Sequence, residues 1–337
     1  MSTDASPVDS QGPLHGDDPS PWISTGLDAY RLEHNALPGF DRDDVATGVT
    51  LLGRPLSAPL VIALASEGRA RSPLAARTLV GAAQAARVAI DVGTVPDGRA
   101  DRDAIRDLRD VAPDIPLIVS VPILQLDGVD APAVCADAAA VVQADAVVIR
   151  TVPVAEVLDP GRVIRFSRMR DVIASVATAL DIPVLVGETG HGIGRATAAM
   201  LSETGIAGID TGGRGGRRRE PGQRTDDPVL DRVITEFADW GLSTAESVVQ
   251  SRAGFPDGLV IASGGLRSGV DVAIAMALGA DATGIGVPLS RAAQVSRHAV
   301  EDRLRAITES LRIAMLLTGA RDVAALQSAT LLPRLPT

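Results

Sequence analysis

Short runs rich in Val, Ile and Leu recur along the chain, and each run ends in small or polar residues. Longer segments rich in Ala, Arg and Asp separate these runs, and their apolar residues follow the period of an α-helix. Eight such units predict parallel strands joined by helical crossovers, which favours a closed (β/α)8 TIM barrel over an open sheet. The predicted strands cover residues 59–64, 89–93, 116–122, 146–152, 183–189, 207–213, 258–265 and 282–287. The clearest helical patterns cover residues 72–86, 165–180, 268–279 and about 290–319.

The length of 337 residues suits a single barrel with extensions. We expect a disordered leader over residues 1–22, which are rich in Ser, Asp, Pro and Gly, then the barrel over 23–327 and a tail over 328–337. Aromatic residues make up only 2% of the chain. The core must therefore be packed with Ala, Val, Leu and Ile, as suits a parallel sheet buried on both faces.

Charge and composition exclude several classes of function. The formal charge of −10 argues against nucleic acid or an anionic membrane as the main partner, because both would be repelled. All 32 Lys and Arg positions are arginine, so no lysine is present to form a Schiff base. Cys135 is the only cysteine and is interpreted as a buried helix thiol. No run is apolar enough to span a membrane and no secretory pattern opens the chain, so we expect a cytoplasmic location.

The active site of such a barrel lies at the carboxyl ends of its strands. The run IASGGLRSG ends the seventh predicted strand at Ser263, Gly264 and Gly265 and then opens a helix that Ser268 can cap, while the eighth strand ends at Gly286. Glycine lets backbone N–H groups approach an anion, and a helix N-terminus adds the positive end of its dipole. We therefore predict a phosphate site here. The alternative is that these turns need glycine for backbone reasons alone.

A second glycine-rich segment, TGGRGGRRRE at 211–220, carries four arginines on an acidic chain. Arg217, Arg218 and Arg219 together with Arg214 form a candidate anion trap for a phosphorylated small molecule. Our hypothesis is a lid that orders over this substrate. The alternative is a solvated basic loop.

The chain resembles the type 2 isopentenyl diphosphate isomerases, which are flavin enzymes with this barrel. The resemblance covers roughly residues 26–327, and FADWGLSTAES with the LRIAMLLTGA segment is its most specific part. The matching stretches are YRLEHNALPGFD (30–41), LLGRPLSAPLVIA (51–63), VAPDIPLIVS (111–120), GETGHGIGRATAAML (187–201), AGIDTGGRGG (207–216), FADWGLSTAES (237–247), IASGGLRSGVDVAIAMALGAD (261–281) and LRIAMLLTGARDVAAL (311–326).

The resemblance implies a homo-oligomer that binds reduced FMN and, with magnesium, moves a double bond in a prenyl diphosphate without net redox change. The flavin is implied to serve as the acid/base. The implied flavin contacts match Ser66, Thr94, Gly264, Gly265, Arg267 and Gly286, and we add Ser120 and Ser263 as cofactor-binding candidates.

Departures from the family pattern fall where the chemistry takes place. The family's MTGG after strand one reads ASEG here, which places Glu67 near the flavin, and Gly187 replaces a lysine that faces the flavin. After strand four, the family's histidine, asparagine, glutamine and magnesium-binding glutamate align with Arg150, Val152, Ala155 and Gly161. No protein ligand set for a metal is predicted, and the need for Mg²⁺ stays open. Loss of the lysine should make an anionic reduced flavin harder to hold.

Three residues are the catalytic candidates: Glu188, His191 and Glu67. His191 follows strand five at the mouth of the barrel, where an imidazole can exchange a proton near neutral pH. Glu188 lies at the end of that strand, and it is interpreted either as a ligand contact or as the partner of an arginine. The alternative for His191 is a hydrogen-bonded loop histidine.

The sequence leaves three alternative functions. The first is a divergent isomerase-like flavoenzyme in which Arg150, Arg217, Arg218 and Arg219 replace the lost magnesium as diphosphate partners. The second is a flavin-free isomerase, cyclase or lyase that acts on a phosphorylated substrate through the three catalytic candidates. The third is a catalytically dead paralogue that regulates an active isomerase.

Overall fold

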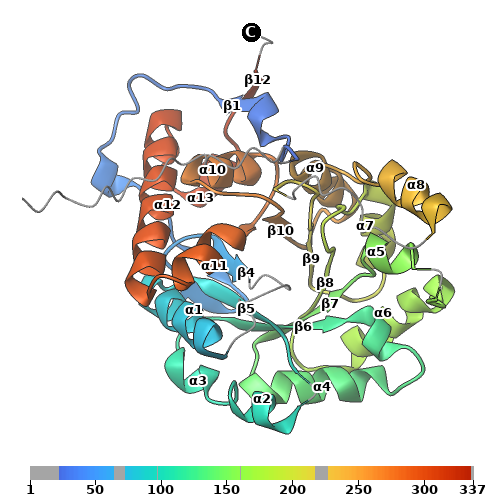
Figure 1. Ribbon diagram of the computed structural model, residues 1–337. Helices are drawn as coiled ribbons and strands as arrows, with labels where there is room; N and C mark the ends of the chain where they lie inside the picture. Colours follow the sequence, from blue (N-terminus) through green and yellow to red (C-terminus); the bar gives the residue numbers. More distant parts are fainter. Residues whose placement is uncertain (1–22, 64–72, 97, 160, 217–226, 335–337) are drawn as a thin grey trace, which may run out of the picture.

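The computed structural model describes residues 23–63, 73–96, 98–159, 161–216 and 227–334. Eight parallel strands close into a barrel in the order β10-β11-β4-β5-β6-β7-β8-β9, which confirms the predicted fold class. The helices surround these strands (Figure 1). Each barrel strand overlaps one predicted run: β4 (Leu60–Ala63), β5 (Ala89–Thr94), β6 (Leu117–Pro122), β7 (Ala146–Arg150), β8 (Val184–Gly187), β9 (Gly208–Asp210), β10 (Leu259–Ser263) and β11 (Ala282–Ile285).

Helix boundaries follow capping signals in the sequence. Ser268 caps α10, as predicted for this turn, and its side chain and that of Asp271 form a reciprocal capping box. The single helix predicted over about 290–319 is wrong, because Ser296 adopts an extended conformation and caps a new helix. The α-helices are α1 (Pro73–Ala86), α2 (Arg99–Asp103), α3 (Leu108–Val111), α4 (Ala131–Val142), α5 (Val154–Val157), α6 (Met169–Ala179), α7 (Arg195–Ser202), α8 (Pro228–Glu236), α9 (Thr244–Gly254), α10 (Gly269–Ala277), α11 (Val287–Ala293), α12 (Arg297–Thr318) and α13 (Val323–Gln327).

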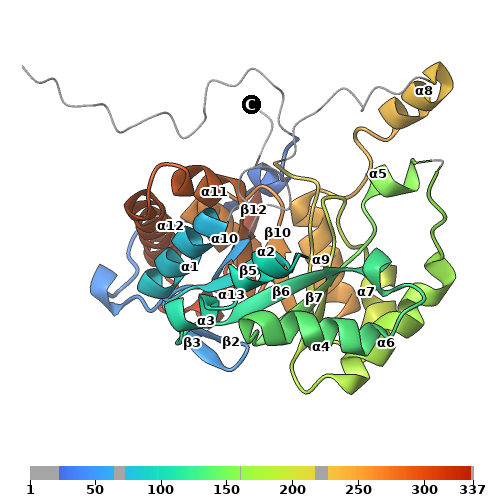
Figure 2. The same ribbon diagram turned by 60° about the horizontal axis from the view of Figure 1, so that its bottom comes forward.

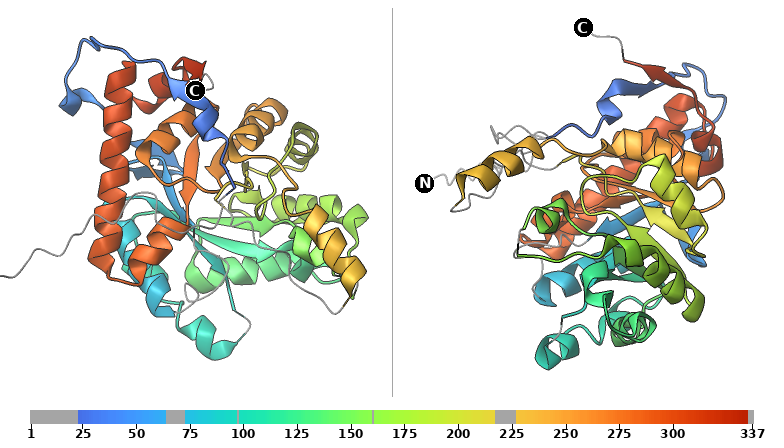
Figure 3. Two further views of the ribbon diagram at one scale, coloured as in Figure 1. Left: turned by 45° about the horizontal axis from the view of Figure 1, so that its top comes forward. Right: turned by 90° about the vertical axis from the view of Figure 1, so that its right-hand side faces the viewer.

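Several short elements lie outside the barrel. Strand β1 (Tyr30–Leu32) pairs with β12 (Leu331–Pro333), so part of the predicted tail lies beside the segment that precedes the barrel. Strands β2 (Val49–Leu51) and β3 (Arg54–Leu56) form an antiparallel hairpin. Helix α8 stands away from the barrel, as Figures 2 and 3 show. The 3-10 helices are η1 (Leu27–Ala29), η2 (Arg42–Asp44), η4 (Ile123–Leu126) and η5 (Phe166–Arg168).

The core consists of the aliphatic side chains that the composition predicts. Strand β6 is buried from Leu117 through Val121, which is the pattern of a parallel strand covered on both faces. Cys135 is fully buried in α4, and this burial raises the pKa of its thiol to about 11. Within the described ranges, no helix combines the length and the apolar character that a membrane span needs.

Candidate active site

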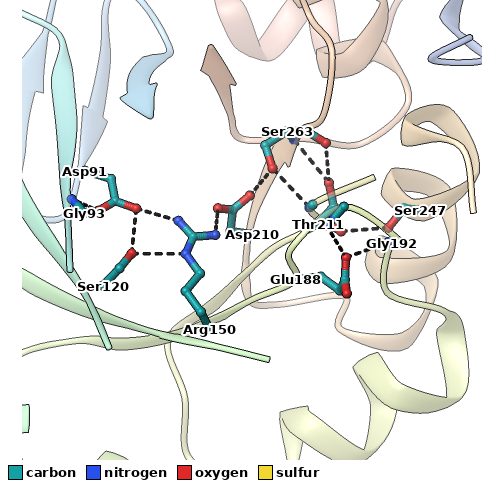
Figure 4. A network of polar contacts seen from close by, with 12 residues as sticks. Asp91, Gly93, Ser120, Arg150, Glu188, Gly192, Asp210, Thr211, Ser247 and Ser263 are labelled. Carbon is teal, nitrogen blue, oxygen red and sulfur yellow. Dashed lines mark hydrogen bonds and ion pairs between the residues drawn. The ribbon is translucent and has the colours of Figure 1, made fainter. Parts of the chain in front are cut away.

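A polar network crosses the barrel at the carboxyl ends of five strands, and Figure 4 shows it from close by. The Arg150 guanidinium lies at its centre and donates through Nη2 to Asp91 at 2.5 Å and through Nη1 to Asp210 at 2.5 Å. The Ser120 hydroxyl accepts from Arg150 Nε at 3.0 Å and donates to Asp91 at 2.8 Å. The Ser263 hydroxyl donates to the other carboxylate oxygen of Asp210. Side chains from β5, β6, β7, β9 and β10 thus form one layer inside the barrel.

The side chains of this layer differ in exposure and in charge. The Arg150 side chain is 20% exposed, against 6% for Asp91 and 9% for Asp210. Burial alone would lower the pKa of Arg150, but the charges of Asp210 and Asp91 and their hydrogen bonds outweigh it and raise that pKa above its ordinary value. Arg150 is therefore a permanent cation between two carboxylates, and these three groups carry a net charge of −1.

The glycine at 187 makes room for this arginine. A Cβ atom at Gly187 would lie 2.4 Å from Arg150 Nη1 and 3.0 Å from Arg150 Cζ. Strand β8 can lie beside the Arg150 side chain only because residue 187 has no side chain. The lumen keeps a cavity of about 10 Å³, roughly the room of one water molecule, lined by Asp91, Arg150 and Asp210 together with apolar side chains.

The glycine-rich turns after β9 and β10 pack against each other. Gly264 and Gly265 have φ angles of +109° and +83°, in the region that favours glycine. A Cβ at Gly264 would lie 2.2 Å from the Gly213 carbonyl oxygen, and one at Gly265 would lie 2.5 Å from the Gly216 nitrogen. The Thr244 hydroxyl donates to the Gly264 carbonyl at 2.5 Å. Backbone conformation and close packing therefore account for these glycines without any ligand.

The same turns also offer hydrogen-bond donors. Within the part of the chain that the structure describes, the backbone N–H groups of Gly264, Gly265 and Gly286 donate to no other group. Gly264 and Gly265 precede α10, and Gly286 is the N-cap residue of α11. Partly buried N–H groups at adjacent strand ends are the donor set that a phosphate needs, so these residues fit a phosphorylated cofactor.

Glu188 and His191 lie together in the loop after β8 but outside the arginine network. The Glu188 Oε2 atom accepts backbone N–H bonds from Gly190 at 2.6 Å, from His191, and from Gly192 at 3.0 Å. His191 Nδ1 lies 3.9 Å from Glu188 Oε1, and each side chain is 11% exposed. Burial raises the pKa of the Glu188 carboxyl, and the N–H bonds from His191, Gly190 and Gly192 oppose this effect without cancelling it.

The raised pKa of Glu188 leads to a prediction about the pH dependence of stability. The folded state holds the Glu188 proton more tightly than the unfolded state, so this group destabilises the fold as pH rises from 4.5 through the raised pKa. We expect Glu188→Gln to remove that loss, which urea unfolding at several pH values between about 4 and 8 will measure.

Glu246 provides a matched control of opposite sign. Hydrogen bonds from Ser243 lower the pKa of the Glu246 carboxyl, so its contribution to stability is present above pH 4.5 and is lost as pH falls through the lowered pKa. Glu246→Gln should therefore lower stability above pH 4.5. Identical pH profiles for wild type and Glu188→Gln would contradict the prediction for Glu188.

The remaining predicted residues are dispersed or lie outside the described ranges. Thr94 is exposed at the end of β5, and the backbone N–H of Arg267 donates to Asp271. Arg214 donates to the Asp239 carbonyl at 2.5 Å. Across the described ranges, no group of three or more His, Cys, Asp or Glu side chains could hold a metal ion, and the Gly161 N–H binds Asp159. The predicted residues outside the described ranges are Ser66, Glu67, Arg217, Arg218 and Arg219.

Asp91 is the functional candidate that the sequence analysis missed. It lies in the run AIDVG, inside a strand that is otherwise apolar, and its side chain is almost fully buried. A carboxylate within such a run is the signal that could have found it, because a buried charge needs a partner. Asp210 lies in the sixth predicted strand, 207–213, and was not named as a site candidate either.

Comparisons with known proteins show a broad class of proteins to which this chain is similar. The FMN-dependent dehydrogenase family matches residues 171–333. A mandelate oxidase with an FMN adduct has the same fold, with a TM-score of 0.67, 22% identity and coverage of 92% of this chain and 90% of that chain. The solved structure thus shows the β/α barrel fold, and residues 171–333 are similar to the FMN-dependent dehydrogenases.

Curated relatives narrow the class to one family. The isopentenyl-diphosphate delta-isomerase of Xanthobacter autotrophicus is 38% identical over 313 residues, covering 90% of each chain. That of Synechococcus sp. is 36% identical over 312 residues, covering 91% of this chain and 90% of the relative. That of Cronobacter sakazakii is 34% identical and covers 94% and 93%. The chain belongs to the type 2 isopentenyl-diphosphate delta-isomerase family and is an isomerase-like enzyme.

Proposed function

We propose that this chain binds FMN and acts on a prenyl diphosphate by acid/base chemistry without net redox change. The proposal is carried by one observation: within the described residues, the backbone N–H groups of Gly264, Gly265 and Gly286 donate to no other group. These free donors suit the phosphate of the cofactor. When bound, FMN would supply the acid/base group of the isomerisation. Family membership supports both the cofactor and the substrate class.

The chain's own residues would divide the remaining tasks. The N-terminus of α10 adds the positive end of its dipole to the phosphate site. Glu188 Oε2 is occupied by backbone donors, so Oε1, beside His191 Nδ1, is the atom on which Glu188 would hold or release a proton. We retain Glu67 as a third acid/base candidate, and Arg217, Arg218 and Arg219 as diphosphate candidates, from the sequence alone. The homo-oligomer also stays a prediction.

The absorption spectrum and the affinities of two flavins test this function. We expect the purified protein to take up FMN and to bind it at least about 100-fold more tightly than riboflavin, because even two of the three charge-assisted hydrogen bonds to phosphate contribute about 3 kcal/mol. Equal affinities for FMN and riboflavin would contradict the phosphate site, and a colourless protein that takes up no FMN would contradict the function.

Two observations favour a second candidate, a flavin-free isomerase, cyclase or lyase on a phosphorylated substrate. Gly187 removes the cation that the family directs at the flavin, and the layer below the mouth carries a net negative charge. This candidate predicts binding of inorganic pyrophosphate without uptake of FMN. A catalytically dead paralogue would instead turn over no prenyl diphosphate and form a stable complex with an active isomerase.

A further inference from the structure

The side chain of Arg150 is held in one orientation by partners on three sides. Asp91, Asp210 and Ser120 take one N–H each from its three nitrogens. A guanidinium has five N–H donors, so two remain that donate to nothing within the described residues. A donor group fixed in this way loses little conformational freedom when a ligand binds.

The two spare donors belong to the most accessible charged group of the layer. Arg150 is 20% exposed, whereas Asp91 and Asp210 are 6% and 9% exposed. The Gly187 side of the guanidinium carries no side chain that could cover it. Of the three charged side chains in the layer, that of Arg150 is therefore the most accessible to a ligand.

The surrounding charge decides which kind of acceptor these donors suit. Both carboxylates contact the guanidinium, so the layer as a whole is negative by one charge. A diphosphate would gain hydrogen bonds from Arg150 but would be repelled by this layer, in a site where burial weakens solvent screening. An uncharged carbonyl oxygen gains the same hydrogen bonds without the repulsion.

We propose that Arg150 binds an uncharged carbonyl acceptor of the flavin ring rather than the diphosphate of the substrate. Asp91 and Asp210 are positioning residues, because they aim the guanidinium and outweigh its positive charge. This inference rests on the proposed binding of FMN. The ring would then lie against Arg150, and the phosphate of the cofactor would be left to the glycine turns at Gly264, Gly265 and Gly286.

The test compares three ligands on Arg150→Met and on a matched control, Arg109→Met. Arg109 is also a poorly exposed arginine, 12% exposed and paired with Asp145, which directly precedes β7 at the opposite end of the barrel. In Arg150→Met we expect the affinities for FMN and riboflavin to fall by the same factor, about tenfold or more. Pyrophosphate affinity, measured on the FMN-loaded protein, should stay within about twofold. Arg109→Met should change none of the three.

Other results would overturn the inference about Arg150, and one of them would also overturn the proposed function. A tenfold loss of pyrophosphate affinity in Arg150→Met, or unchanged riboflavin affinity, would overturn the inference while FMN binding by the wild type stands. A wild type that binds neither flavin overturns the proposed function and this inference together. If Arg150→Met does not fold, the variant R150M/D91N/D210N carries the same test, because it leaves no unpaired charge in the layer.

Discussion

Replacing Gly264 with alanine is expected to lower the free energy of unfolding by about 3 to 4 kcal/mol. A φ of +109° strains any residue with a Cβ, which costs about 1 to 2 kcal/mol. The new methyl group would also lie 2.2 Å from the Gly213 carbonyl oxygen, so the turns after β9 and β10 must separate, at a further cost of about 2 kcal/mol. Urea unfolding measures the total, and FMN affinity should fall with it because the proposed phosphate donors move.

Gly53→Ala is the matched control for this prediction. Gly53 has a φ of +78°, but nothing lies within 4 Å of a Cβ built there. Its replacement should cost only the conformational strain, about 1 kcal/mol. Equal losses for the two variants would mean that the packing between the glycine turns contributes nothing.

Replacing Arg150 with methionine is expected to cost about 3 to 5 kcal/mol, because it leaves two buried carboxylates without a cation. The variant R150M/D91N/D210N should recover most of this loss, since it removes the unpaired charges. Arg102→Met is the control, because the ion pair of Arg102 with Asp137 lies at the surface, with 26% and 62% exposure, and such pairs contribute about 0 to 1 kcal/mol. A loss in Arg150→Met no larger than in Arg102→Met would show that the layer is not a coupled unit.

The barrel could be predicted because its signals are local. Each strand is a short aliphatic run, and Ser268 with Asp271 marks the start of α10 within four residues of sequence. The break at Ser296 escaped prediction because the apolar spacing continues on both sides of it. The period of the apolar residues alone does not reveal a single N-cap residue inside a long helical pattern.

The polar layer could not be predicted because closure of the barrel creates it. Arg150 was predicted as a diphosphate partner, but its own partners Asp91 and Asp210 were not predicted, because they lie 59 and 60 residues away in sequence, on strands that do not adjoin β7. Strands buried on both faces show no alternation between polar and apolar residues, so their sequence does not reveal which side chains enter the lumen. Glu188 was correctly placed at a strand end, but its capping of the following loop depends on backbone geometry.

The close approach of residue 187 to Arg150 restricts the order in which this sequence could evolve. A side chain at 187 and the present conformation of the arginine at 150 exclude each other sterically. An ancestor with a larger residue at 187 could acquire this arginine arrangement only after 187 had become glycine. In that order of events glycine at 187 would be a permissive step, and a later return to a larger residue would displace the Arg150 guanidinium. Transplanting Arg150 alone into a relative with a side chain at the equivalent position should fail for the same reason.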